Sequence, residues 1–228
     1  MKFFAKPTSN ESVFGFIYFL LQLLIIPAII TVVNMMLPNP YPEAAVNFIF
    51  FAVNFIFVTV IFRKFLLSNF RVLAERPWMV LRYAGIGFLI YMAGNWAFGL
   101  LVTLLVPDFS NINDAIIMEM VQDNYNLMTI GTVLLVPVAE ECFYRGLIFR
   151  NLCDKSPLLG YILSMVFFSL AHVLGYVTVE DLGTLAICFL QYLPAGFALA
   201  WSYRRCGSIF APILIHMTVN QIGMLLMR

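Results

Sequence analysis

The stretch that decides the fold is MTIGTVLLVPVAEECFYRG, residues 128–146, an apolar run that carries two adjacent carboxylates, Glu140 and Glu141. Two further apolar runs contain the only histidines of the chain, His172 and His216. An ionisable group in hydrocarbon costs about 3 kcal/mol or more, so such groups persist mainly where they pair or perform chemistry. Three runs that each bring such a group indicate a polar site assembled between membrane helices.

The composition indicates an integral membrane protein with the lipid bilayer as its surroundings, and we expect it in the plasma membrane. Hydrophobic residues make up 62% of the chain, charged residues 11%, and the mean hydropathy is +0.93. Soluble domains are nearer to about 45–50% apolar and about 25% charged. So little charge leaves no patch for nucleic acid. The four cysteines show no paired spacing, which argues against a disulfide framework or a cysteine metal pair.

The hydropathy predicts an all-α, polytopic membrane helix bundle of about seven transmembrane helices. A hydrocarbon core of about 30 Å needs about 20 helical residues, and the runs are too long and continuous for barrel strands. With no linker or repeat to divide it, the chain reads as one domain, residues 1–228, with the chemistry-bearing motifs within 140–220. The predicted spans are 13–37, 44–62, 79–106, 127–147, 158–176, 182–203 and 208–227.

The basic residues predict the orientation of the chain. Of the 13 Lys and Arg residues, all except Arg228 lie before the first span or around alternate links, whereas the other links carry acids. By the positive-inside rule the N-terminus is cytoplasmic and the C-terminus lies outside. The longest outer link, 107–126, shows apolar residues at helical spacing, so we expect a short interfacial helix near 112–124, as a lid or a structural belt.

Each polar group on these runs has a structural interpretation beside a chemical one. Glu141 and Arg145 are four apart and can pair on one helix face, which leaves Glu140 as the freer carboxylate. The alternative is a purely structural Glu–Arg pair at a helix end. His172 follows Phe168 by four residues; taken alone, it could simply hydrogen-bond a neighbouring helix.

The last run repeats the spacing of four with two hydrogen-bond donors. His216 and Asn220 share a face, and both can donate to a developing oxyanion. Alone, this pair too could be a link between helices, and Gln191 in the sixth run is most simply read in that way. Together, a carboxylate, two imidazoles and an amide on three helices are the groups required to hydrolyse an amide bond.

In the order E-E-x-x-x-R, F-x-x-x-H and H-x-x-x-N, these motifs resemble the CAAX protease and bacteriocin-processing (CPBP/Abi) family of intramembrane proteases. Here they are Glu140–Arg145, Phe168–His172 and His216–Asn220. The resemblance implies a membrane-bound hydrolase that cuts a peptide bond near the C-terminus of a membrane-associated, in some members prenylated, protein or peptide.

The resemblance also implies a role for each residue. Glu140 with His172 would activate water, and His216 with Asn220 would stabilise the oxyanion. Glu141, Arg145 and Phe168 would support them.

A metal-free, glutamate-type mechanism is favoured over a zinc metalloprotease. The chain has no HExxH, so the two-histidine zinc helix is absent. A zinc ion would have to draw His172, His216 and a glutamate from three helices. We therefore predict no cofactor, with zinc as the alternative.

Two other functions compete with intramembrane proteolysis. One is a non-catalytic membrane scaffold or bacteriocin-immunity protein of the same fold. The other is a proton-coupled transporter, which would predict an internal repeat and paired broken helices; neither is evident in the sequence.

Overall fold

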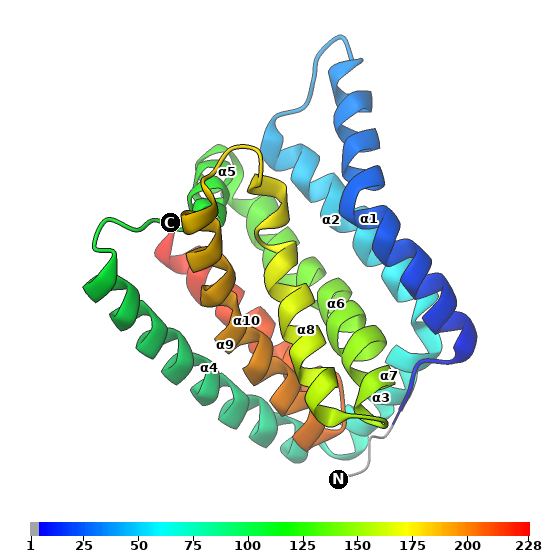
Figure 1. Ribbon diagram of the computed structural model, residues 1–228. Coiled ribbons are helices and arrows are strands. Elements are labelled where there is room, and N and C mark those ends of the chain that lie inside the picture. The colour runs from blue at the N-terminus through cyan, green and yellow to red at the C-terminus, as the bar shows by residue number, and fades with distance from the viewer. Residues whose placement is uncertain (1–4) are drawn as a thin grey trace.

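The computed structural model describes residues 5–228, which form a bundle of helices (Figure 1). No strand occurs among these residues. The helices are α1 Ser9–Met35, α2 Glu43–Ile61, α3 Arg63–Glu75, α4 Pro77–Leu105, α5 Ile112–Thr129, η1 Ile130–Leu135, α6 Val136–Glu141, η2 Cys142–Phe149, α7 Arg150–Cys153, α8 Pro157–Ala171, η3 Leu174–Tyr176, α9 Leu182–Cys206 and α10 Phe210–Leu226.

The predicted polytopic all-α bundle is confirmed. Within the described residues, six helical runs are long and apolar enough to cross a bilayer: α1, α2, α4, the continuous run Ile112–Cys153, Pro157–Tyr176 and α9. The seventh predicted span corresponds to α10, which is apolar but only 17 residues long. At about 1.5 Å per residue, α10 reaches only about 26 Å, so the described residues contain six helical runs long enough to cross the bilayer and one shorter apolar helix.

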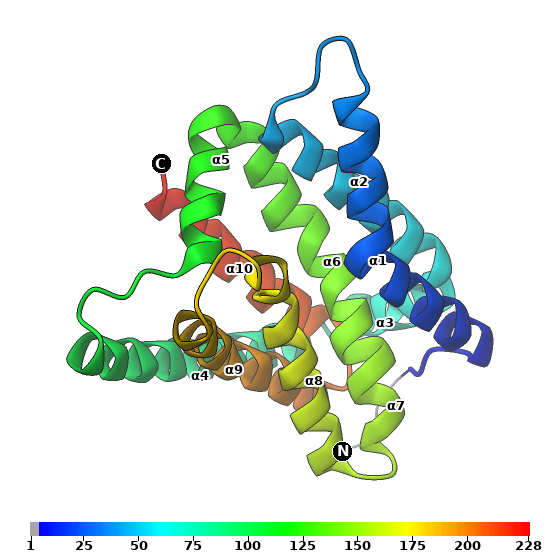
Figure 2. The ribbon, with the colours of Figure 1, turned by 45° about the horizontal axis from the view of Figure 1, so that its top comes forward.

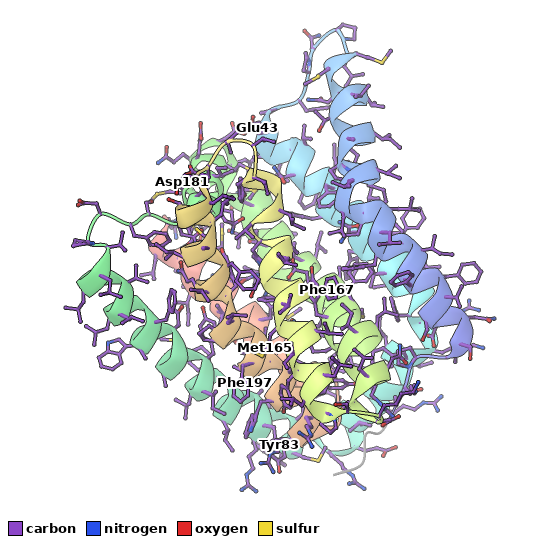
Figure 3. All side chains as sticks on the ribbon, in the orientation of Figure 1. Glu43, Tyr83, Met165, Phe167, Asp181 and Phe197 are labelled. Carbon is purple, nitrogen blue, oxygen red and sulfur yellow. The ribbon has the colours of Figure 1, made fainter. Side chains whose placement is uncertain are left out.

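The links fall at two opposite ends of the bundle, as the alternation of basic and acidic links predicts. Figure 1 shows α3 and α7 at one end and the C-terminus and α5 at the other. The labelled side chains of Figure 3 agree with this division, because Glu43 and Asp181 lie at one end and Tyr83 at the opposite end.

The predicted helix near 112–124 is present and joins the next span through a kink. Asn111 caps its first turn by accepting from the backbone N–H groups of Asn113 and Asp114. Asn124 leaves helical geometry (φ −152°, ψ 87°), and its Oδ1 accepts from Leu127 N at 3.1 Å. Asn124 therefore caps a second helix, which explains why the predicted span begins at 127.

The helix α3 was not predicted, because the basic residues of 63–76 indicated a simple link. Its buried face carries Phe65, Asn69 and Val72, so only Phe65 and Val72 give an apolar signal. The first turn of α3 is capped from a distant segment. Glu11, buried at the start of α1, accepts from the backbone N–H groups of Lys64 and Phe65, both at 2.9 Å.

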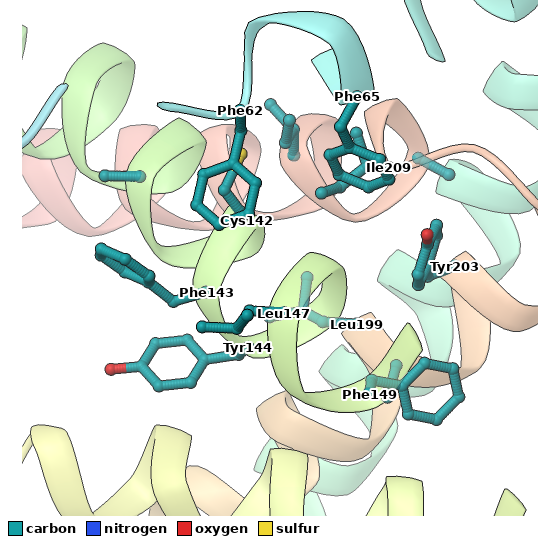
Figure 4. Packing of buried hydrophobic residues seen from close by; sticks show 14 of the residues in the cluster. Phe62, Phe65, Cys142, Phe143, Tyr144, Leu147, Phe149, Leu199, Tyr203 and Ile209 are labelled. Carbon is teal, nitrogen blue, oxygen red and sulfur yellow. The ribbon is translucent and has the colours of Figure 1, made fainter. Parts of the chain in front are cut away.

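The core lies where η2 passes between the other helices. Figure 4 shows aromatic and aliphatic side chains from α3, η2 and α9 packed around this segment. Phe62 contacts Phe143 edge-on, with 6.3 Å between ring centroids, and Phe149 contacts Tyr203 at 6.0 Å. The outer faces remain apolar, as expected for surfaces that contact lipid: Leu24, for example, is 76% exposed. The helix run that carries the two adjacent acids is thus fixed on several sides (Figures 2 and 4).

The helices α4 and α9 approach closely at a glycine. A Cβ added to Gly87 would lie 2.6 Å from Ile215 Cδ1 and 2.8 Å from Ser202 Cβ. Small residues allow such approach between membrane helices. Gly85, on the same helix, has no neighbouring atom within 4 Å of its Cβ position.

We expect Gly87→Val to lower the free energy of unfolding by about 1–3 kcal/mol, because its side chain would displace α9 and α10. The measurement is a thermal or denaturant unfolding curve in detergent. Gly85→Val is the matched control, with a valine in the same helix but facing open space. Equal stability of the two variants would contradict the close contact.

Candidate active site

The two adjacent carboxylates lie on α6, a short α-helix between two π-helical segments. Pro137 opens α6, and its missing N–H removes one helical hydrogen bond. The segments η1 and η2 on either side are wider turns. Such turns inside membrane helices change the direction in which successive side chains point, and they occur often at functional sites.

Glu141 and Arg145 form the predicted ion pair, and both are fully buried. Arg145 Nη1 lies 3.1 Å from Glu141 Oε1. The other terminal nitrogen, Nη2, donates to the carbonyl oxygen of Gly196 on α9 at 3.2 Å. The guanidinium group also lies 4.6 Å from the ring centroid of Phe168 on α8. The pair therefore joins η2 to α8 and α9.

His216 on α10 is held by the same carboxylate. Its Nδ1 lies 2.9 Å from Glu141 Oε1, and its Nε2 lies 4.0 Å from Glu140 Oε2. The carboxylate of Glu141 already accepts from a guanidinium, so Nδ1 of His216 is the donor. In the neutral ring Nε2 is then an acceptor, and it can donate only when the ring carries both protons.

Glu140 is the freer carboxylate, as predicted. Its side chain is 24% exposed, and Oε2 accepts no hydrogen bond from the described residues although the atom is buried. Glu140 lines a cavity of about 540 Å³ whose other walls are mainly apolar side chains of α1 and α2. An unbonded carboxylate oxygen beside such a cavity requires a partner, and water is the simplest one.

His172 lies one residue beyond the end of α8, where it caps the helix. Its Nδ1 lies 2.8 Å from the carbonyl oxygen of Phe168, which can only accept. The ring proton is therefore on Nδ1, and Nε2 is left as the acceptor. The ring stacks on Tyr192 of α9, with 4.2 Å between centroids and an interplanar angle of 29°.

A second cavity, of about 70 Å³, brings four of the predicted residues together. His172, His216 and Asn220 all line it, with Phe168 between the two imidazoles. Asn220 Nδ2 donates to the carbonyl oxygen of Thr132 at 2.7 Å, which leaves its second N–H available. The volume is sufficient to hold water.

The predicted residues thus divide between two cavities. His216 lies between them and reaches both Glu140 and the residues around Asn220. Glu140 and His172, the pair expected to act together on water, make no direct hydrogen bond. Any cooperation between them requires a bridging molecule.

Two residues around the site were not predicted. Tyr192 stacks on His172, and Thr132 binds Asn220 through its backbone. Tyr192 is four residues before the buried Gly196, but an aromatic residue in an apolar span has no pattern that distinguishes it from a residue facing lipid. A backbone acceptor such as the carbonyl of Thr132 leaves no signal in the sequence.

The side chains that a zinc site would need are His172, His216 and a glutamate. Among residues 5–228 no group of three His, Cys, Asp or Glu side chains is arranged to hold a metal ion. His216 uses Nδ1 for Glu141 and His172 uses Nδ1 for a backbone carbonyl, so Nε2 is the nitrogen of each ring that could bind a metal ion.

We expect Arg145→Met to lower the free energy of unfolding by about 3–5 kcal/mol, because the buried carboxylate of Glu141 would lose its guanidinium partner and keep only the hydrogen bond from His216. Unfolding in detergent would measure the change. Arg71→Met, at an exposed position of α3, is the matched control. The combined change Glu141→Gln with Arg145→Met should recover part of the loss. An Arg145→Met protein as stable as the control would show that the buried pair does not hold the helices together.

Comparisons with known proteins agree with the motifs. Residues 122–222, which include all of the candidate residues, match the family model described as "Type II CAAX prenyl endopeptidase Rce1-like". The resemblance predicted from the three motifs is therefore confirmed over this part of the chain.

Two curated proteins are similar to the chain over part of its length. "UPF0177 protein YxdF" of Lactococcus lactis subsp. lactis (strain IL1403) is 27% identical over 90 residues, 40% of this chain and 44% of the relative. "Putative membrane peptidase YdiL" of Bacillus subtilis (strain 168) is 32% identical over 95 residues, 41% of this chain and 34% of the relative. The chain thus spans less than half the length of either relative. No solved structure matches it.

Proposed function

We propose that this protein is an intramembrane endopeptidase of the glutamate type, which hydrolyses a peptide bond near the C-terminus of a membrane-associated protein or peptide. The observation that carries the proposal is the position of His216. One imidazole contacts the buried Glu141–Arg145 pair through Nδ1 and faces the unbonded carboxylate of Glu140 through Nε2. This arrangement separates a carboxylate that holds structure from a carboxylate that is available for chemistry.

In the proposed reaction, Glu140 accepts a proton from a water molecule whose oxygen attacks the substrate carbonyl carbon. His172 orients this water through Nε2, the nitrogen that carries no proton. The tetrahedral oxyanion receives hydrogen bonds from the second N–H of Asn220 and from Nε2 of a doubly protonated His216. The C–N bond then breaks, and the leaving amine takes the proton from Glu140.

The matched family model and the Bacillus subtilis relative named "Putative membrane peptidase YdiL" support this activity. The substrate enters the proposal only as a membrane-associated chain, prenylated or not. The mainly apolar walls of the cavity beside Glu140 are suited to such a substrate.

We expect Glu140→Gln to reduce cleavage of a membrane-anchored reporter peptide by about 100-fold or more, because the variant cannot accept the proton of water. The measurement is product formation by the purified protein in liposomes, with unfolding curves to show that the fold is retained. Glu119→Gln, on an exposed face of α5, is the matched control and should cleave normally. Wild-type cleavage should also persist with a strong zinc chelator.

Undiminished cleavage by both Glu140→Gln and His172→Ala would reject the glutamate mechanism. Loss of cleavage with the chelator, restored by zinc, would favour the metalloprotease alternative. A folded wild-type protein that cleaves no membrane-anchored reporter, yet confers a phenotype that Glu140→Gln retains, would indicate a scaffold or immunity protein.

We further propose that the start of α1 faces the cytoplasm and the C-terminus lies outside, in the plasma membrane. The support is the charge division, because α3 and the α7–α8 link carry basic residues at one end of the bundle.

A cysteine placed at Asn39 should react with a membrane-impermeant maleimide on intact cells, whereas one at Glu75 should react only after permeabilisation. Both positions are exposed, and the four native cysteines are buried. The reverse labelling pattern would invert the orientation.

A further inference from the structure

His172 lies at a place where the helix itself does little to fix its ring. His172 directly follows α8, and the next helical segment is the short 3₁₀ turn η3. Besides the covalent link at Cβ, a hydrogen bond holds the ring, from Nδ1 to the carbonyl oxygen of Phe168. The contacts on the two faces of the ring therefore help to set the direction of Nε2, the other ring nitrogen.

Tyr192 packs against one face of the His172 ring. Its ring lies 4.2 Å from the imidazole centroid and is nearly parallel to it, whereas Phe168 on α8 contacts the imidazole at 4.6 Å and 49°. The imidazole thus packs against one aromatic ring from its own helix and one from α9. Tyr192 also lines the small cavity beside His216 and Asn220.

Tyr192 is in turn fixed by the first turn of α5. Asn113 Nδ2 donates to the Tyr192 hydroxyl at 3.0 Å, and Asn113 Oδ1 accepts from the hydroxyl of Tyr176 at 3.0 Å. The neighbouring residue on α9, Gln191, accepts from Asn111 Nδ2 at 2.8 Å. The helix α5 is therefore attached to α9 by two adjacent side chains, of which only Tyr192 touches His172.

We propose that Tyr192 and Asn113 are positioning residues for His172, so that the start of α5 sets the direction of Nε2 in the active site. This assigns a role to the long link 107–126, which contains none of the three motifs. The inference rests on the proposed function, because the rate effects below require that His172 takes part in peptide hydrolysis. Its structural part can be tested without catalysis.

The structural test uses nuclear magnetic resonance of the full chain labelled with ¹⁵N-histidine. The chain has only two histidines, and His172→Ala assigns the signals. In the wild-type protein we expect His172 to show distinct signals for a protonated Nδ1 and an unprotonated Nε2. In Tyr192→Leu and in Asn113→Ala these two signals should broaden or average, while those of His216 stay unchanged. Gln191→Leu, which removes the neighbouring α5–α9 hydrogen bond, should leave both histidines unchanged.

The kinetic test compares the same variants on the reporter peptide. Tyr192→Leu should lower kcat by about 10- to 100-fold with little change in KM, because a displaced catalytic group slows the reaction without loosening the bound substrate. Asn113→Ala should show a smaller loss, and Tyr192→Phe, which retains the stack, should recover most of the rate. Gln191→Leu should match the wild type.

The proposal is overturned if Tyr192→Leu leaves the His172 signals as in the wild type, or if it lowers kcat no more than Gln191→Leu does. If the wild-type protein cleaves no reporter, the proposed function fails, whereas the resonance experiment still decides whether Tyr192 and Asn113 position the ring.

Discussion

The contact on which the rest of the structure depends is the buried cluster of Glu141, Arg145 and His216. A charge inside an apolar bundle is tolerable only when it is paired and hydrogen-bonded. Here one carboxylate oxygen, Oε1 of Glu141, receives both the guanidinium and the imidazole. Because Arg145 also binds the backbone of α9 and His216 lies on α10, satisfying this one oxygen requires η2, α9 and α10 to assume a fixed arrangement. The polar chemistry and the helix packing are therefore one constraint.

Hydrogen bonds of this kind also determine which ring nitrogen carries the proton in each histidine. Glu141 occupies Nδ1 of His216, so only Nε2 can face Glu140, and it lies 4.0 Å away. The carbonyl of Phe168 acts in the same way on His172, again leaving Nε2 free. The two rings thus have the same tautomer for different reasons, one held by a charged group and one by the backbone. Only the doubly protonated form of His216 can donate from Nε2 to an oxyanion.

Local spacing in the sequence predicted the contacts that run along one helix, and missed those that run between helices. The Glu141–Arg145 pair follows from a separation of four residues, and the hydropathy alone locates the long spans. By contrast, the hydrogen bond between His216 and Glu141 joins residues 75 apart, and nothing in either run indicates which acid the imidazole meets. The helix α3 was missed for another reason: its face of Phe65, Asn69 and Val72 is short, and the basic residues around it resemble those of a loop.

The buried carboxylate of Glu11 has a consequence for how the protein is made. One of its oxygens completes the cap of α1 through Thr8, and the other binds backbone amides of α3, of which Lys64 lies 53 residues later in the chain. During synthesis the N-terminal part of the chain leaves the ribosome first, so Glu11 has no α3 amides to bind until the second membrane helix and the start of α3 have been made. Until then its carboxylate stays hydrated. The helix α1 can enter the bilayer early, but the hydrogen bonds from α3 to Glu11 form only after α1, α2 and the start of α3 are all present.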